Sequence, residues 1–343
     1  MLHFDLQKAA DKLIKEMFQL KEGENVVISC DTSSSMDVVD AIASSARAAG
    51  GKVMVVTFPT PGGVGKAADA DIPVDVFTAA VCATDVWIEL NHQWLIYSTP
   101  YTVAEKENKK LRYINMDDFT PEVLMRIIGS VDCKALKDFQ IMAHDMHKKA
   151  KKLKATTPAG TNVEFEINPD YVFTCDYGDA SVPGMHMCPG QLNIIPEFGT
   201  VNGTIVFDGS ITPPFGRKLT EPVKLTVKNS KIEKVEGGSD AVVFEKWLKS
   251  FNDEGMLKMA HMAYGFNPGA QLTGNVVEDE RIWGCTEWGI GFVSAEEAPP
   301  KGQDASSHCD GICLSASIWL DGKMIMENGK IVEEELLKIS PVK

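Results

Sequence analysis

Short apolar runs alternate with helical segments through residues 1–150, and this alternation constrains the fold more than any other feature of the chain. Between the first two apolar runs, Met36 to Ala49 has helical periodicity and ends at Gly50 and Gly51, a common helix stop. Buried strands are predicted at residues 25–30, 52–58, 85–90 and 111–114. Because such strand–helix units form parallel sheets covered by helices, the sequence predicts an α/β N-terminal domain with a parallel sheet.

The second half of the chain has a different pattern. A long helical stretch, Lys134 to Lys154, is followed by the turn-rich sequence TTPAGTN, where we place the domain boundary. The predicted domains are therefore residues 1–154 and 155–343. Two later segments, 223–238 and 317–332, contain Asn-Ser and Asp-Gly turns that are typical of β-hairpins. These features predict a mixed, mostly antiparallel α+β second domain.

The charge and composition of the chain limit its partners and its location. With 34 Lys and Arg against 48 Asp and Glu, the net charge of −14 disfavours nucleic acid, which requires a basic face. No apolar stretch reaches the roughly 18 residues that cross a membrane, and the N-terminus lacks the apolar core of a signal peptide. The eight cysteines show no paired framework, so we expect reduced thiols in a cytoplasmic protein.

His308 and Asp310 form an H-x-D pair in the extended stretch SSHCDGI. Because successive side chains of a strand alternate between its faces, both residues are predicted to point to the same face. An imidazole and a carboxylate placed side by side can share one metal ion. A surface hydrogen bond between the two side chains is the alternative interpretation.

Two further polar residues stand in apolar surroundings. His261 lies in KMAHMAYGFNPGAQ, where a core histidine with a satisfied hydrogen bond is the alternative, and Glu287 lies in WGCTEWGIG. A buried carboxylate is costly unless it is paired or bound to a cation. A single metal site formed with His308 and Asp310 would satisfy all four residues, which makes the second domain the predicted metal-binding catalytic domain.

The remaining histidines are interpreted from their local sequence. His3, His144 and His147 lie in charged helical segments and are expected at the solvated surface. His92 follows the end of a predicted strand, a frequent position for a functional residue in α/β domains. His186 lies in the loop PGMHMCPG, where it either lines a pocket or is simply packed.

Three blocks of the second half resemble the M29 (aminopeptidase T-like) superfamily. They are AHMAYGFNPGAQ, EDERIWGCTEWGIGF and SSHCDGICLSASIWLDG, and recognisable blocks extend over residues 155–325. The superfamily contains thermophilic aminopeptidases of the aminopeptidase T type and the 2,5-dihydroxypyridine 5,6-dioxygenases of nicotinate degradation. The resemblance also implies a homodimer.

The resemblance implies different metal sites in the two branches of the superfamily. The aminopeptidases hold two metal ions through glutamates and a histidine, and at those positions this chain has Gln191, His261 and Glu287. The dioxygenases hold one Fe(II) through a histidine before the glycine block and through the H-x-D pair. His261, His308 and Asp310 match that pattern, a facial triad that leaves coordination positions open for substrate and oxygen.

The dioxygenase branch is therefore the closer one, which implies a mononuclear non-haem Fe(II) enzyme. Its expected reaction opens the ring of a hydroxylated N-heteroaromatic such as 2,5-dihydroxypyridine. The resemblance gives His186 a substrate-contacting position. His92 and Tyr97 are the nearest counterparts of a catalytic histidine that the branch supplies from its N-terminal domain, and together with His186 they would handle the proton.

Further roles and two other functions remain open at this point. Glu287 would orient a ligand or act as an extra ligand. Trp283, Trp288 and Tyr264 would form a flat apolar wall for an aromatic substrate. One alternative function is a metal-dependent hydrolase of aminopeptidase or amidohydrolase type, which would use Zn, Mn or Co on an amide substrate. The other is a metal-dependent binding protein without catalysis.

Overall fold

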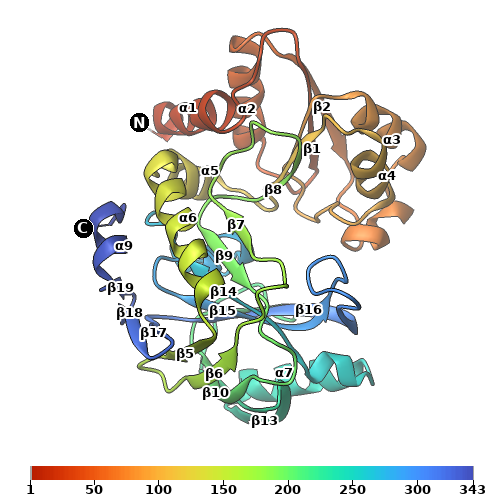
Figure 1. Ribbon diagram of the computed structural model, residues 1–343. Helices are drawn as coiled ribbons and strands as arrows, with labels where there is room; N and C mark the ends of the chain where they lie inside the picture. Colours follow the sequence, from red (N-terminus) through yellow and green to blue (C-terminus); the bar gives the residue numbers. More distant parts are fainter. Residues whose placement is uncertain (1, 343) are drawn as a thin grey trace. The chain divides into compact units, whose positions relative to one another are not determined.

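The computed structural model describes residues 2–342 and divides the chain into two compact units (Figure 1). The first unit comprises Met1–Cys133 and Asp176–Pro189, and the second comprises Lys134–Cys175 and Gly190–Lys343. This division differs from the single boundary predicted at residue 154. The chain leaves the first unit, begins the second and then returns to the first for residues 176–189.

The described residues of the first unit form one five-stranded parallel sheet, ordered β2-β1-β3-β4-β8. Its strands are β1 (Asn25–Asp31), β2 (Lys52–Phe58), β3 (Val86–Glu89), β4 (Arg112–Asn115) and β8 (Gly184–His186). The four strands predicted from apolar runs are confirmed, but β2 was wrongly expected to be buried, because it is an edge strand whose side chains are mostly exposed or half-buried. The fifth, β8, pairs with β4 and was not predicted, because its three residues lie in a segment without an apolar run.

Helices cover both faces of this sheet, as the alternating pattern predicted. Figure 1 shows α1 (Leu2–Lys12) and α2 (Met36–Ala48) on one side, and α3 (Val74–Ala83) and α4 (Thr99–Glu107) on the other. Shorter helical turns follow in the same unit at Leu13–Met17, Gly65–Ala70, Pro121–Leu124 and Met125–Gly129. The parallel-sheet fold class of this unit is thereby confirmed.

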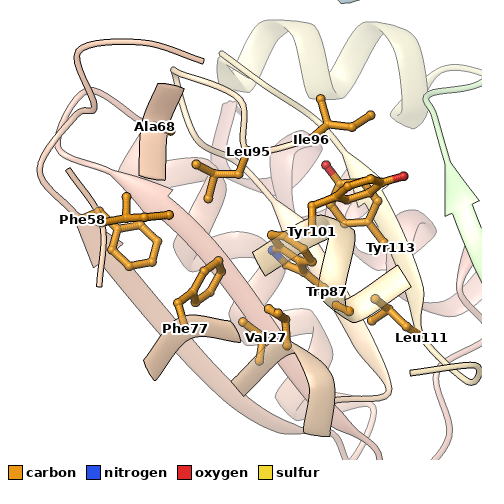
Figure 2. Packing of buried hydrophobic residues seen from close by; sticks show 13 residues of the cluster. Val27, Phe58, Ala68, Phe77, Trp87, Leu95, Ile96, Tyr101, Leu111 and Tyr113 are labelled. Carbon is orange, nitrogen blue, oxygen red and sulfur yellow. The ribbon is translucent and has the colours of Figure 1, made fainter. Parts of the chain in front are cut away.

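The core beneath α3 and α4 is unusually rich in aromatic rings (Figure 2). The ring centroids of Trp87 and Tyr113 lie 4.6 Å apart, and those of Tyr101 and Tyr113 lie 5.1 Å apart. Trp87 is fully buried, and its Nε1 donates to the Ser29 hydroxyl at 2.9 Å. Buried aromatic pairs of this kind add about 0.5–1.5 kcal/mol each beyond their burial, so they fix β3 and β4 against the helices.

The second unit contains an eight-stranded antiparallel sheet, ordered β13-β12-β10-β6-β5-β17-β18-β19. The two predicted hairpins are confirmed as β12–β13 and as β17–β18–β19. The strand bounds are β5 Lys152–Thr156, β6 Asn162–Glu166, β10 Asn202–Phe207, β12 Val223–Lys228, β13 Lys231–Gly237, β17 Ser317–Leu320, β18 Lys323–Glu327 and β19 Lys330–Ile331.

A six-stranded sheet of the same unit, ordered β11-β16-β15-β14-β9-β7, carries the predicted metal ligands. The pairs from β11 through β9 are antiparallel. The bounds are β7 Thr174–Asp176, β9 Gln191–Ile194, β11 Ile211–Thr212, β14 Met259–Gly265, β15 Thr286–Val293 and β16 Gln303–Cys313. The mostly antiparallel α+β character predicted for this half of the chain is confirmed.

The long helix predicted at residues 134–154 is shorter in the structure. Helix α6 spans Cys133–Lys149, and strand β5 begins at Lys152. The prediction was wrong for the last residues because Leu153 and Ala155 alternate with exposed lysines, the burial pattern of a strand.

The second unit also contains three shorter helices and a helical turn. These are α7 Ser239–Ser250, the turn Glu254–Leu257, α8 Val276–Asp279 and α9 Glu334–Ile339. Among residues 2–342, no helix has the length and apolar character that crossing a membrane requires.

Candidate metal centre

One face of three adjacent antiparallel strands, β14, β15 and β16, brings the predicted ligands together. In the register of β15 with β16, Gly289 pairs with Asp310 and Gly291 pairs with His308. Because side chains alternate along a strand, His308 and Asp310 share the face that carries Glu287. His261 reaches the same face from β14, and its side chain contacts both Glu287 and Asp310.

Gly289 provides the space that the His261 ring occupies. A Cβ atom at position 289 would lie 2.5 Å from both Cε1 and Nδ1 of His261, far inside contact distance. Any other residue at this position would therefore displace the imidazole. The glycine-rich sequence of β15 is thus explained by a ring that lies across the middle strand of the site.

Three donor groups converge on this face. The donor atoms of His261, His308 and Asp310 all lie within 4.8 Å of one another. Asp310 Oδ1 is 3.0 Å from His308 Nε2 and 3.5 Å from His261 Nε2. The two imidazole rings are nearly parallel, with an interplanar angle of 17° and centroids 5.0 Å apart. The structure thus brings together the three residues that the sequence singled out as metal ligands.

The two histidine rings are oriented by hydrogen bonds at different nitrogens, Nδ1 in His308 and Nε2 in His261. The Nδ1 atom of His308 lies 2.9 Å from the Phe292 carbonyl, so Nδ1 donates and Nε2 faces Asp310. For His261, Nε2 lies 2.5 Å from Oε1 of Glu287, a side chain that is only 1% exposed. A ring whose second nitrogen is tied to a carbonyl is the arrangement that metal-binding histidines usually show.

The charged side chains of this cluster strongly shift one another's pKa values. Burial opposes protonation of His261, but the carboxylates of Glu287 and Asp310 outweigh it and raise its pKa to about 9. Burial would raise the pKa of Asp310, yet His308 and His261 lower it to about 2. The pKa of Glu287 is raised, chiefly by burial, although His261 opposes this shift. Such perturbed groups are typical of functional sites.

The donor set fits a divalent transition metal. Two imidazole nitrogens and one carboxylate oxygen form the combination that holds non-haem Fe(II) in facial-triad sites, and zinc accepts the same donors. Asp310 carries its charge throughout the physiological range because its pKa is lowered. The residues present at this face of the sheet therefore match the group that the resemblance implies.

Behind the three donors lie buried polar groups that the sequence did not reveal. Glu280 and Arg281 stand in the charged run EDER, which is typical of a solvated surface, yet Arg281 is fully buried and the Glu280 side chain is 13% exposed. Gln191 Nε2 lies 2.6 Å from Oε2 of both Glu280 and Glu287. No local pattern distinguishes a buried charged run from an exposed one, so only the fold identifies these residues.

The other predicted catalytic residues belong to the first unit. His92 follows β3, and its Nδ1 lies 2.7 Å from Asp118 Oδ1, which raises its pKa. His186 ends β8 and hydrogen-bonds through Nε2 to the Val182 carbonyl at 2.8 Å, while burial lowers its pKa. Tyr97 is 66% exposed and has a positive φ of 68°. His92 and His186 both lie where strands of the parallel sheet end.

Two expectations about aromatic and histidine side chains were wrong. Trp288 and Tyr264 alternate with Glu287 and Ala263, so they point to the opposite sheet face and are fully buried, not parts of a substrate wall. His147 is fully buried rather than solvated, because its Nε2 hydrogen-bonds to the Tyr264 hydroxyl at 2.7 Å. Trp283 is partly buried, and its ring packs 5.3 Å from that of Phe139.

The combination of a parallel α/β unit with a mostly antiparallel unit is a fold that other solved structures share. AmpT from Thermus thermophilus has this fold, with a TM-score of 0.70 at 11% identity over 97% of this chain and 100% of that chain. More specifically, the chain belongs to the 2,5-dihydroxypyridine 5,6-dioxygenase (NicX) family, whose model matches residues 10–333.

A curated relative is similar in sequence, and a solved structure is similar in fold. The 2,5-dihydroxypyridine 5,6-dioxygenase of Pseudomonas putida is 27% identical over 224 residues, which span 63% of this chain and 63% of that protein. The structure of 2,5-dihydroxypyridine dioxygenase from the same species has a TM-score of 0.80 at 22% identity, and covers 97% of this chain and 99% of the other. At 22% identity, the similarity to this solved structure supports a shared fold only.

Proposed function

We propose that this protein is a mononuclear non-haem Fe(II) dioxygenase that opens the ring of a hydroxylated N-heteroaromatic such as 2,5-dihydroxypyridine. The observation that carries the proposal is the convergence of His261, His308 and Asp310 within 4.8 Å on one sheet face, in a chain of the NicX family. This donor set is the facial triad of Fe(II) oxygenases. The expected partner is thus a small aromatic molecule.

In this proposal His261, His308 and Asp310 hold the iron, and Fe(II) supplies the redox chemistry that lets oxygen react with an aromatic ring. The Phe292 carbonyl keeps the Nε2 atom of His308 directed toward Asp310. Glu287 lies 2.5 Å from Nε2 of His261, so it orients the ring in the metal-free protein and would be placed as an extra ligand once Nε2 holds the cation. The chain itself therefore supplies a rigid set of three donor groups on β14 and β16, and Gly289 of β15 leaves room for the His261 ring.

Proton transfer is the second task of the protein, because the substrate hydroxyl groups must lose protons during ring opening. In the first unit, the His92 imidazole beside the Asp118 carboxylate has the composition of a general base. His186 is the less basic of the two, since burial lowers its pKa. We propose His92 as the base and His186 as a substrate contact, with Tyr97 as the alternative proton donor.

A second candidate function is a metal-dependent hydrolase using Zn, Mn or Co on an amide. The observation that favours it is the presence of Glu287 beside His261, with Glu280 joined to Glu287 through Gln191, since carboxylates can join zinc ligands or activate a metal-bound water. Gln191 weighs against a second cation there, because its neutral amide lies between the two carboxylates. The dioxygenase is therefore preferred.

One experiment separates these functions. The protein is reconstituted with Fe(II) under anaerobic conditions, and oxygen uptake is recorded after 2,5-dihydroxypyridine is added. The dioxygenase proposal expects substrate-dependent oxygen consumption that His261→Ala abolishes together with metal binding. Release of an amine from peptide or amide substrates with Zn, Mn or Co, without oxygen uptake, would contradict the dioxygenase proposal and support the hydrolase. Metal binding without either reaction would indicate a binding protein.

We also propose that the protein forms a homodimer, which rests on the family resemblance alone. Light scattering coupled to size-exclusion chromatography measures this directly. A mass near twice 37.5 kDa is expected. A monomer at micromolar concentration would contradict the proposal without affecting the assignment of the metal ligands.

A further inference from the structure

A row of buried polar side chains continues across the sheet behind the three proposed ligands. Gln191 lies on β9, opposite Gly265 of β14, and is 9% exposed. Its Nε2 is 2.6 Å from Oε2 of Glu287 and 2.6 Å from Oε2 of Glu280. One amide nitrogen therefore donates its two hydrogens to two different carboxylates, which uses its full donor capacity.

The orientation of this amide is fixed from its other end. Arg281 NH2 lies 3.4 Å from Oε1 of Gln191, and Arg281 NH1 donates to the Val277 carbonyl at 2.6 Å. Turning the amide by 180° would place Oε1 against two carboxylates and the NH₂ group against a guanidinium. Both contacts would be repulsive, so Arg281 and the carboxylates select the same orientation.

This arrangement restrains Glu287 through both of its oxygens. Oε2 accepts from Gln191, and Oε1 lies 2.5 Å from Nε2 of His261. A carboxylate held at both oxygens cannot rotate about its last bond without losing one of these partners. Because burial removes water as a replacement donor, the loss of Gln191 would leave Oε2 unsatisfied and favour a rotated Glu287.

We propose that Gln191 is a positioning residue of the metal centre: it keeps Oε1 of Glu287 directed at the Nε2 atom of His261, so that this carboxylate would lie beside a cation bound there. Gln191 acts indirectly, since its side chain hydrogen-bonds to Glu280, Glu287 and Arg281. The inference rests on the proposed function, because it concerns the cation that His261, His308 and Asp310 would hold.

Two substitutions test this role in the full-length, metal-free protein. Gln191→Met keeps a similar volume but removes the donor, and Gln191→Asn keeps the amide but withdraws it by one methylene. The control is Gln140→Met, which removes a fully buried amide that donates to the Gln191 backbone carbonyl at 2.8 Å. Co²⁺ is titrated as the probe, and its visible absorption reports both affinity and ligand geometry.

The expected result is a Co²⁺ affinity about 10–100-fold weaker in both Gln191 variants, the usual effect of removing a group that orients a ligand. Their d–d bands are also expected to shift, while Gln140→Met keeps the wild-type spectrum. Wild-type affinity and an unchanged spectrum in the Gln191 variants would overturn the positioning role, and so would an equal loss in the control. Circular dichroism checks folding, and Gln191→Asn carries the test if Gln191→Met does not fold.

Failure of this inference is distinct from failure of the proposed function. If the wild type and the Gln191 variants bind Co²⁺ equally tightly, only the role of Gln191 is overturned. Wild-type protein that binds Co²⁺ and responds to Gln191 substitution, but consumes no oxygen with Fe(II) and 2,5-dihydroxypyridine, overturns only the dioxygenase. A wild-type protein that binds no Co²⁺ removes the metal centre on which both depend.

Discussion

The Nε2 atom of His261 lies 2.5 Å from Oε1 of Glu287, and the Glu287 side chain is only 1% exposed. The same nitrogen is 3.5 Å from Oδ1 of Asp310, so it faces two carboxylates at once. A proton on Nε2 is stabilised by both of them, and a cation that binds this nitrogen must displace that proton. Metal binding and proton release are therefore linked at this residue.

This linkage predicts a pH dependence of metal binding. The pKa of His261 is raised to about 9, so below that pH the nitrogen carries a proton that competes with the cation. The apparent Co²⁺ affinity should rise roughly tenfold for each pH unit from 6 to 9, as expected for the loss of one proton. Co²⁺ titrations at several pH values measure this slope.

A variant identifies the cause of that slope. Glu287→Gln removes the nearest carboxylate, so the pKa of His261 should fall and the rise in affinity should end at a lower pH. Asp85→Asn serves as a control, because it removes a carboxylate of the first unit. A flat pH profile in the wild type, or an unchanged profile in Glu287→Gln, would contradict the assignment.

Gly289→Ala should damage the metal centre while leaving the fold intact. The new Cβ would lie 2.5 Å from two atoms of the His261 ring, so the imidazole must move. Displacement of a reacting group by about 1 Å commonly costs about 100-fold in activity. Gly216→Ala is the matched control, since its Cβ would meet nothing within 4 Å. Equal metal affinity and turnover in both variants would show that the ring tolerates the methyl group.

His147 should make the second unit sensitive to acid. Burial lowers its pKa to about 4, whereas the ring in an unfolded chain takes up a proton near 6.5. The unfolded state therefore binds more protons in this window, and stability is lost as the pH falls from 6.5 toward 4, by up to about 3 kcal/mol.

Urea unfolding at pH 7 and pH 5 measures the effect of His147. His147→Leu should lose this component of the pH dependence, although it also removes the hydrogen bond to Tyr264. His144→Leu, on the same helix but partly exposed, should keep it. The assignment fails if the two leucine variants show the same dependence on pH as the wild type.

Glu89 should have the opposite effect in the first unit. It is fully buried on β3, where it accepts from the Leu95 amide and hydrogen-bonds to Tyr113, and burial raises its pKa to about 8. The unfolded side chain ionises near 4.5, so the folded state binds more protons and loses stability as the pH rises from 4.5 to 8.

Glu89→Gln tests this interpretation, because the amide cannot ionise. The variant should gain stability relative to the wild type as the pH rises, by about 4 kcal/mol at most between pH 5 and 8. Thermal unfolding followed at both pH values measures the difference, with the exposed Glu107→Gln as the control. A constant difference between variant and wild type at the two pH values would refute it.

The sequence was most informative where a pattern has a local physical cause. The β1 and β3 strands are visible as apolar runs because both are interior strands of a parallel sheet beneath helices. The His308–Asp310 pair is visible because alternation in a strand is strictly local. Strand β8 has no such signature, since it consists of three residues, GMH, that are stabilised by pairing with the distant β4.

Other residues were misjudged or missed because their environment depends on long-range packing. His147 lies among charged residues, and only contact with Tyr264 of a distant strand removes it from solvent. The burial of Glu280 and Arg281 was missed for the same reason. A run of charged residues is typical of a solvated surface, and the sequence does not show that these two side chains are buried in the fold. Residues that act through such distant neighbours, Gln191 among them, are the ones that a single sequence does not reveal.

Strand β8 has a consequence for how the protein is made. The first unit is discontinuous, because its edge strand at Gly184–His186 is synthesised after helix α6 and strands β5 to β7. Since a ribosome adds about 5–20 residues per second, an incomplete four-stranded sheet persists for seconds with the edge of β4 open. During that interval the nascent chain is vulnerable to mispairing, and a gene fragment that stops at residue 133 would retain that defect permanently.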